Sequence, residues 1–169
     1  MIDTFIENIK KKINLTLDET EQLFDKIFNG EVDTSSLTSL LDALDKKGET
    51  PDELAGATTS MRKNSKSIAV NHDQVIDCCG TGGLGKKMIN VSTSVSFVLA
   101  AAGLKVAKHG NRTATGKSGS ADFLEAAGTN LNKSSEYFSD SLDKIGLGFL
   151  FAQNHHPGMK YVMEARRIL

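Results

Sequence analysis

Glycines and hydrogen-bond donors are concentrated in one stretch of the chain, residues 77–120. Residues 80–83 read Gly-Thr-Gly-Gly and follow an apolar pair, Val75-Ile76, that is typical of a buried strand. Glycines leave main-chain N–H groups open to a bulky anion, because no Cβ stands in the way. Ser92-Thr93 then precedes an apolar run that predicts a helix. A strand, a glycine-rich loop and a helix N-terminus together form a phosphate site, since unpaired N–H groups and the helix dipole favour negative charge.

The glycine string alone does not identify a ligand. Residues 80–83 match neither the Rossmann spacing nor the Gly-Lys-Ser/Thr of a P-loop, and a plain strand-to-helix turn would explain them. A second donor-rich loop favours a binding site. The apolar segment Leu104–Ala107 leads into Lys108-His109-Gly110-Asn111-Arg112. Because ligands bind at the carboxyl ends of parallel strands, two such loops are expected to border one crevice.

Four basic side chains have more than one possible role. Lys108 and Arg112 could neutralise phosphate or lie on the surface, and their place after a buried strand favours ligand contact. His109 could be a neutral hydrogen-bonding group or take a chemical role. Arg166 could be a structural cation or could bind a carboxylate, which its planar guanidinium matches well.

The alternation of strand and helix patterns predicts an α/β domain in the second part of the chain. Strands are expected at Gln74–Cys78, Leu104–Ala107 and Leu147–Phe151, and helices at Ser92–Ala102, Ser120–Ala127, Glu136–Lys144 and Pro157–Arg167. This alternation favours parallel pairing with right-handed crossovers. The polar loops that follow the strands are therefore expected to converge at one edge of the sheet.

A small helical domain is predicted for residues 1–68, and the α/β domain for residues 69–169. Thr16 and Glu19 have the spacing of a capping box, Gly48 is a stop signal, and Thr50-Pro51 is a start signal. The leucine and isoleucine stripes of these helices indicate either a core or a subunit interface. We expect them to pack against a second copy of the chain.

The composition is that of an ordinary globular protein. The 169 residues carry a net charge of −1, and this balance argues against nucleic-acid binding. The only two cysteines, Cys78 and Cys79, cannot form a disulfide framework; we expect them to be reduced, buried and unreactive, as in the cytoplasm. No apolar run is long enough to span a membrane.

The ordered series of motifs resembles anthranilate phosphoribosyltransferase, an enzyme family of tryptophan biosynthesis. The matching segments are Gly80–Gly83, Asn90–Thr93, Lys108–Arg112, Lys117–Asp122, Phe149–Ala152, His155-His156-Pro157 and Arg166-Arg167. The resemblance covers essentially the whole chain. It implies a glycosyltransferase that moves the phosphoribosyl group of phosphoribosyl pyrophosphate onto anthranilate and releases pyrophosphate. It also implies Mg²⁺, a cytoplasmic location and a homodimer formed through the helical domain.

The resemblance further implies which residues contact the substrates. For phosphoribosyl pyrophosphate they are Gly80, Gly83, Leu84, Met88, Asn90, Val91, Ser92, Thr93, Lys108, His109, Gly110, Asn111, Arg112, Thr113, Ala114, Thr115, Gly116 and Ser120. For anthranilate they are Gly80, Asn111 and Arg166. Ser92 would also contact Mg²⁺.

Two positions depart from the family pattern. Leu84 stands where the family usually has Asp, and Met88 where it usually has Thr or Ser. Both changes remove polar groups expected near the diphosphate and Mg²⁺, so altered metal use is expected. The family is also much longer and continues into an acidic pair that holds Mg²⁺. We therefore expect this chain to be a fragment or a truncated product that turns over poorly by itself.

Two other functions stay open from the sequence. A nucleoside phosphorylase of similar architecture also binds phosphate near a helix N-terminus, although the Lys-His-Gly-Asn-Arg loop does not resemble that family. A non-catalytic relative of the same fold could instead bind nucleic acid or another phosphate ligand. Leu84 and Met88 fit lost catalysis, whereas the near-neutral charge does not fit nucleic-acid binding.

Overall fold

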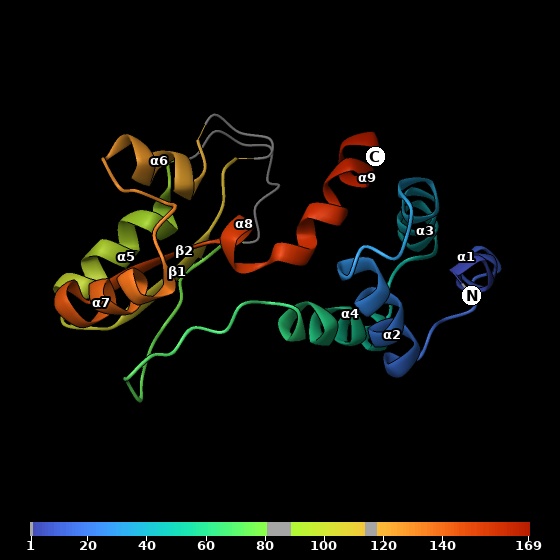
Figure 1. The fold of residues 1–169 in the computed structure, drawn as a ribbon, viewed down its shortest axis with the longest axis horizontal. Helices are drawn as coiled ribbons and strands as arrows, with labels where there is room; N and C mark the ends of the chain where they lie inside the picture. Colours follow the sequence, from blue (N-terminus) through green and yellow to red (C-terminus); the bar gives the residue numbers. More distant parts are fainter. Residues whose placement is uncertain (1, 81–88, 114–117) are drawn as a thin grey trace. The chain divides into compact units, whose positions relative to one another are not determined.

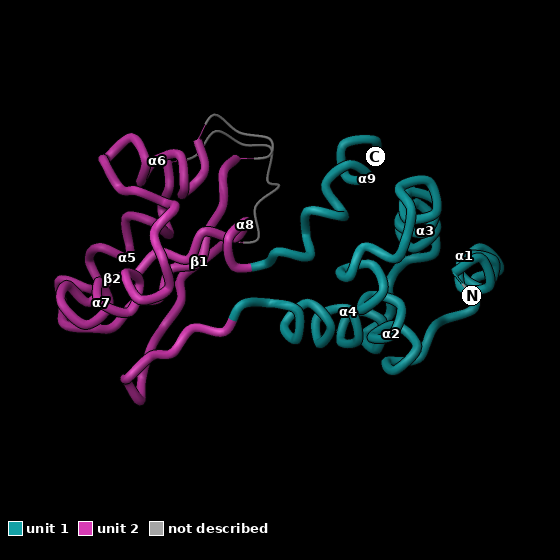
Figure 2. The backbone as a smooth tube through the Cα atoms, in the orientation of Figure 1, with its two compact units in different colours: residues 1–66, 156–169 teal, residues 67–155 magenta. Residues whose placement is uncertain are grey.

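The computed structural model describes residues 2–80, 89–113 and 118–169 (Figure 1). The chain divides into a helical unit, residues 1–66 with 156–169, and an α/β unit, residues 67–155 (Figure 2). The predicted division had placed all of residues 69–169 in the α/β part, whereas residues 156–169 cluster with the helices. Among the described residues, no helix has both the length and the apolar character needed to cross a membrane.

The helical unit begins with four helices whose ends follow the local signals in the sequence. They are α1 (Ile2–Lys10), α2 (Leu17–Phe28), α3 (Thr34–Lys47) and α4 (Pro51–Lys63). Thr16 and Glu19 form the predicted capping box before α2, and Thr50 and Glu53 form a second one before α4. Each box satisfies main-chain N–H groups that a helix start leaves without partners. Gly48, at φ 83°, ends α3 in the left-handed region that favours glycine.

The apolar stripes of these helices pack on one another inside the unit. The core contains Ile6, Ile9, Leu23, Ile27, Leu37, Leu40 and Leu44, all at most 6 % exposed. These side chains are therefore buried within the chain itself, and packing against a second copy stays a prediction for the apolar side chains that remain exposed. Within residues 2–66, three large apolar side chains do remain exposed: Ile13, Leu17 and Leu54.

The last segment of the chain completes this core. A 3-10 helix, η1 (Pro157–Tyr161), leads into α9 (Met163–Ile168), and Val162 and Ala165 are buried among the helical-core residues. The sequence predicted one continuous helix over 157–167. The structure differs because η1 packs closely on the end of α2: a Cβ on Gly158 would lie 2.8 Å from the Cβ of Phe28. This tight approach explains why a short, tighter helix precedes α9.

The α/β unit has a two-stranded parallel sheet with helices around it. Its elements are α5 (Val91–Ala101), β1 (Val106–Gly110), α6 (Ser120–Ala126), α7 (Ser135–Ile145), β2 (Leu147–Phe151) and α8 (Ala152–His155). Val106 pairs with Leu147 and Gly110 with Phe151, which confirms the predicted parallel pairing. The strand predicted over 104–107 begins and ends later than expected, so Lys108 and His109 belong to β1 and not to the loop after it.

Helices cover both faces of β2. The ring of Phe138, on α7, lies so close to Gly148 that a Cβ there would overlap it. Phe149 and Phe151 pack with Ala121 of α6. Both lie an odd number of positions after Gly148, so their side chains point to the other face of the strand. Since successive side chains of a strand point to opposite faces, α7 and α6 lie on opposite sides of β2.

The predicted strand over 74–78 is reduced to a single bridge, in which Ile76 pairs in parallel with Val106. Polar side chains interrupt the ladder beyond it. The carboxylate of Asp77 accepts the main-chain N–H of His109 at 3.1 Å, and the Lys108 ammonium donates to the carbonyl of Cys78 at 2.9 Å. In a continued parallel ladder, that N–H and that carbonyl would have bonded to each other. The segment therefore runs beside β1 without forming a regular strand.

Candidate phosphate-binding site

Three loops of the α/β unit are joined by hydrogen bonds. The thiol of Cys78, just before the glycine string, donates to the carbonyl of Ser92 at 3.4 Å. The side-chain amide of Asn90 donates to the hydroxyl of Ser118 and to the carbonyl of Gly119, both at 3.2 Å. The start of the glycine loop, the start of α5 and the turn before α6 therefore meet, as the sequence predicted.

Among the residues that the structure describes, none caps the N-terminus of α5 with a side chain. Asn90 occupies the N-cap position, but its amide bonds to the next loop instead of capping the helix. Thr93, in the first turn, is 1 % exposed, and its buried hydroxyl oxygen has no hydrogen-bond partner in the described part of the chain. A buried polar group without a partner is costly, and a ligand oxygen would remove that cost. A helix start of this kind and this hydroxyl together make the start of α5 suitable for an anion.

Lys108 is buried at 2 % exposure, which is unusual for a lysine. Its ammonium donates to the carbonyls of Cys78 at 2.9 Å and His109 at 3.3 Å. Its place on β1 thus lets it hold the segment that leads into the glycine loop. Direct contact of Lys108 with phosphate stays a prediction, and the structure adds a role in positioning the loop.

Arg112 binds two carboxylates of α6. Its guanidinium contacts Glu125 at 2.7 and 3.0 Å and Asp122 at 3.3 Å, and lies 5.7 Å from the ring centroid of Phe151. The hydrogen bonds to Glu125, then those to Asp122, raise the pKa of Arg112 above its ordinary value. A phosphate would have to compete with these carboxylates for the guanidinium.

The turn before α6 depends on two glycines and one carboxylate. A Cβ on Gly110 would overlap the hydroxyl of Ser120, and a Cβ on Gly119 would lie 2.5 Å from the nitrogen of Thr113. Asp122 accepts the N–H groups of Gly119 at 2.8 Å and Thr113 at 3.0 Å. These two bonds are the main reason why the pKa of Asp122 lies below its ordinary value. Ser120, a predicted substrate contact, is thereby fixed against β1.

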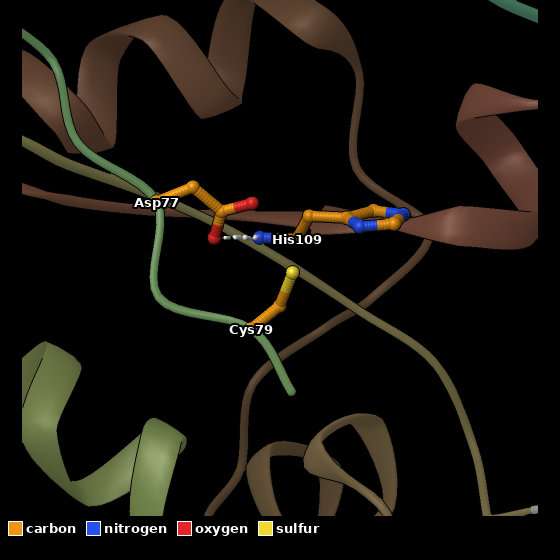
Figure 3. A group of neighbouring side chains, drawn as sticks. All are labelled: Asp77, Cys79 and His109. Carbon is orange, nitrogen blue, oxygen red and sulfur yellow. Dashed lines mark hydrogen bonds between the residues drawn. The ribbon is translucent and has the colours of Figure 1, made fainter. Parts of the chain in front are cut away.

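Asp77, Cys79 and His109 form a cluster that was not predicted from the sequence (Figure 3). One ligand-type atom from each lies within 4.8 Å of the other two. Cys79 is exposed and Cys78 half-buried, so the expectation that both are buried is wrong. Loss of hydration around the sulfur, and then the Asp77 charge, raise the pKa of Cys79. The spacing of Asp77 and Cys79 in an extended segment was the available signal, because alternate residues share a face.

The remaining predicted contacts fall into three groups. Gly83, Leu84, Met88, Ala114, Thr115 and Gly116 lie outside the described residues. Val91, Asn111 and Gly80 are exposed in the α/β unit. Arg166 is exposed on α9, which belongs to the helical unit, so the three predicted anthranilate contacts are drawn from both units.

Ser92 fits Mg²⁺ as one ligand of several. Its hydroxyl is a hard oxygen donor of the kind Mg²⁺ prefers, and it is half-buried in the first turn of α5. In the described residues, the one cluster of three His, Cys or carboxylate ligands is Asp77, Cys79 and His109. A thiolate and an imidazole are too soft for Mg²⁺. Phosphate oxygens of a substrate would therefore have to supply most of the ligands at Ser92.

Comparison with known proteins agrees with this architecture. Residues 3–65 match the helical bundle domain of a glycosyl transferase family, and residues 72–169 match its a/b domain. The chain is 44 % identical over 168 residues to anthranilate phosphoribosyltransferase from Vibrio vulnificus (strain CMCP6), covering 99 % of this chain and 51 % of the relative. It thus spans about half the length of the curated relatives it matches.

Solved structures show the same fold. Anthranilate phosphoribosyltransferase from Thermus thermophilus superposes with a TM-score of 0.90 at 36 % identity, over 97 % of this chain and 50 % of that one. The enzyme from Saccharomyces cerevisiae, in complex with PRPP and Mg, superposes with a TM-score of 0.85 at 24 % identity, over 98 % and 51 %. From the order of its domains, its parallel sheet and these matches, the chain belongs to the glycosyl transferase family with a helical bundle domain and an a/b domain.

Proposed function

We propose that this chain supplies the phosphoribosyl pyrophosphate-binding part of an anthranilate phosphoribosyltransferase. The observation that carries the proposal is the junction of three loops around the uncapped start of α5, where Asn90 joins the turn before α6 and Cys78 joins Ser92. Family membership and the names of the relatives support the same reaction.

The proposed reaction is a displacement at the anomeric carbon of the ribose. The amine nitrogen of anthranilate forms a bond to that carbon while the bond to the pyrophosphate oxygen breaks, and the amine loses a proton. Positive charge develops on the ribose and negative charge on the leaving pyrophosphate. The N–H groups at the start of α5 and the Ser92 and Thr93 hydroxyls would stabilise the phosphates. Fixed hydrogen-bond donors and correct positioning of the substrates would thus supply most of the rate enhancement.

Mg²⁺ fits this scheme as a partner of the diphosphate. We propose that the hydroxyl of Ser92 is its protein ligand among the described residues, with phosphate oxygens completing the set. The cation would offset the negative charge of the leaving group. Lys108 would support the same site indirectly. Its ammonium binds the carbonyl of Cys78 and thereby holds the start of the glycine loop in place.

Binding can be tested with a pair of serine variants on α5. Ser92→Ala removes the proposed hydroxyl and keeps a good helix former, whereas Ser94→Ala removes an exposed hydroxyl that donates to the carbonyl of Asn90 at 3.2 Å. Titration calorimetry of the purified chain with phosphoribosyl pyrophosphate and Mg²⁺ should show binding. Ser92→Ala should weaken it about 10-fold or more, the size of one hydrogen bond to a charged group, and Ser94→Ala should leave it unchanged.

Each result has a defined meaning. Absence of binding by the wild-type chain overturns the proposal for this part of the protein. Equal affinities of the two serine variants would remove Ser92 from the site. Lys108→Ala is less informative, because its ammonium supports two main-chain carbonyls and its loss would also disturb the fold.

We also propose a homodimer formed through the helical unit. Ile13, Leu17 and Leu54 are exposed there, although many other apolar side chains of the unit are buried in its core. Sedimentation at micromolar concentration tests this, and a strictly monomeric, well-folded chain contradicts it. The two free cysteines suit a reducing compartment, so a cytoplasmic location is the matching proposal, to be checked by cell fractionation.

A further inference from the structure

A cluster of three potential metal ligands lies at the edge of the α/β unit, where the glycine loop begins. Asp77 and Cys79 are two residues apart, and His109 is on the neighbouring strand β1. The bridge between Ile76 and Val106 sets the register of the two segments. Beyond the bridge the segment runs beside β1, held by the bonds of Asp77 and Lys108, and this brings the Cys79 side chain close to that of His109.

The Asp77 carboxylate ties the two segments together. It accepts the main-chain N–H of His109 at 3.1 Å, and Figure 3 shows this bond with the Cys79 sulfur beside it. One oxygen, one sulfur and one nitrogen of the three side chains lie within 4.8 Å of one another. In a tetrahedral zinc site, neighbouring ligand atoms lie about 3.5 Å apart, given metal–ligand bonds of about 2.0–2.3 Å. Small rotations of the exposed Asp77 and Cys79 side chains would bring the ligand atoms from their present separation to the separation of a zinc site.

A nucleophilic cysteine is a poorer explanation of the same residues. In such a site a third polar group usually orients the imidazole by bonding to its ring, and Asp77 is the polar group of this cluster that could do so. Here Asp77 bonds to the main chain of His109, and in Figure 3 the imidazole extends away from the carboxylate. The cluster has the ligand types for a metal and lacks the orientation for acyl transfer.

We propose that Asp77, Cys79 and His109 bind a borderline-soft divalent cation, with Zn²⁺ as the best fit. A thiolate, an imidazole and a carboxylate are the three ligand types that zinc takes in proteins, and three protein ligands leave a fourth position for water. Mg²⁺ would not compete well, because it prefers oxygen ligands. This site is thus chemically distinct from the Mg²⁺ proposed at Ser92.

Zinc at this place would join the residue just before Gly80 to β1. If the proposed function also holds, the cation would restrain the start of the glycine loop and lower the affinity for phosphoribosyl pyrophosphate. That consequence rests on the proposed function, whereas zinc binding does not. The metal titration is therefore done without any substrate, so that failure of one proposal is distinguishable from failure of the other.

The adjacent cysteines offer a matched pair of variants. Cys79→Ser removes the proposed ligand, while Cys78→Ser changes a thiol that instead donates to the carbonyl of Ser92. The purified chain, reduced and freed of metal, is titrated with Co²⁺ and then with Zn²⁺ against a chromophoric chelator. A thiolate bound to Co²⁺ produces a charge-transfer band in the near ultraviolet. Circular dichroism confirms that each variant is folded.

We expect the band in the wild-type chain and in Cys78→Ser, and its loss in Cys79→Ser. Zinc affinity should fall at least about 10-fold in Cys79→Ser, His109→Gln and Asp77→Asn, because even loss of an outer-shell partner costs that much. The absence of a band in the wild-type chain overturns the proposal. Loss of the band in Cys78→Ser instead of Cys79→Ser does so too. If zinc affinity is unchanged in both His109→Gln and Asp77→Asn, the thiol of Cys79 binds the metal without the other two residues. That result would also refute the three-ligand site.

Discussion

A buried ion pair in the helical unit offers a sharp test of how its fold is held together. The Lys47 ammonium lies 2.8 Å from the Glu53 carboxylate, and the two side chains are 3 % and 2 % exposed. Glu53 also accepts the main-chain N–H groups of Leu15 at 2.9 Å and Thr50 at 2.8 Å. This carboxylate therefore joins the segment before α2 to the end of α3 and the start of α4.

Removal of the lysine charge should be strongly destabilising. Lys47→Met leaves Glu53 buried without its cation, and breaking one partner of a buried pair costs about 3–5 kcal/mol of unfolding free energy. Its neighbour Lys46 is the matched control, because it pairs with Asp42 at 2.7 Å with side chains 72 % and 44 % exposed. Lys46→Met should cost no more than about 0.5 kcal/mol, as is usual for exposed pairs on a helix.

Urea unfolding followed by far-ultraviolet circular dichroism measures both effects, since the chain has no tryptophan to report by fluorescence. With a denaturant slope of about 1–3 kcal/mol per molar, a loss of about 3 kcal/mol lowers the midpoint by about 1–3 M. Lys46→Met should shift it by less than about 0.5 M. Similar midpoints for the two variants would refute the reasoning, because burial would then not decide the strength of the pair.

The same experiment has a pH dependence with a defined sign. Burial opposes the charge on Glu53, but the bonds from Lys47 and the two N–H groups hold the pKa of Glu53 below its ordinary value. A carboxylate with a lowered pKa stabilises the fold above its unfolded pKa, and this contribution is lost as the pH falls through the folded value. The difference in midpoint between wild type and Lys47→Met should therefore shrink in acid. A constant difference would mean that Glu53 is not charged in the folded state.

Two further predictions concern the α/β unit. Gly110→Ala should lower the melting temperature of the unit and abolish phosphoribosyl pyrophosphate binding, because the new Cβ would overlap the Ser120 hydroxyl. Calorimetry that finds wild-type affinity in this variant would contradict the prediction. Asp122→Asn should destabilise the unit at neutral pH and match the wild type in acid, because the N–H groups of Gly119 and Thr113 hold the pKa of Asp122 low. Melting curves at several pH values test this, and a difference in melting temperature that stays constant with pH would contradict it.

Much of the local structure could be read from the sequence because its signals act over a few residues. The capping box of Thr16 with Glu19 and the glycine stop at residue 48 depend on side chains within one helical turn. The strand over 147–151 and the parallel pairing with β1 followed from apolar runs alternating with helices. The meeting of the loops at one edge of the sheet then followed from topology, because parallel strands share their carboxyl ends.

Other features depended on partners far away in the chain. The predicted strand over 74–78 became a bridge because Asp77 and Lys108 took over hydrogen bonds that a ladder would have used. The sequence predicts that Arg112 is a phosphate ligand. In the structure its guanidinium instead binds Glu125, a residue of α6 that lies 13 positions further along the chain. No local pattern reports which carboxylate will face a given guanidinium.

The sequence by itself determined the order of helices and strands, the caps and the glycine-rich loops, because these follow from backbone preferences and periodicity. Only the tertiary structure decided that residues 156–169 complete the helical core, where Val162 and Ala165 fill space between helices. It also decided that Cys79 is exposed beside Asp77 and His109. Burial and the meeting of side chains arise from packing between distant segments, and the chemistry of both proposed sites depends on those contacts.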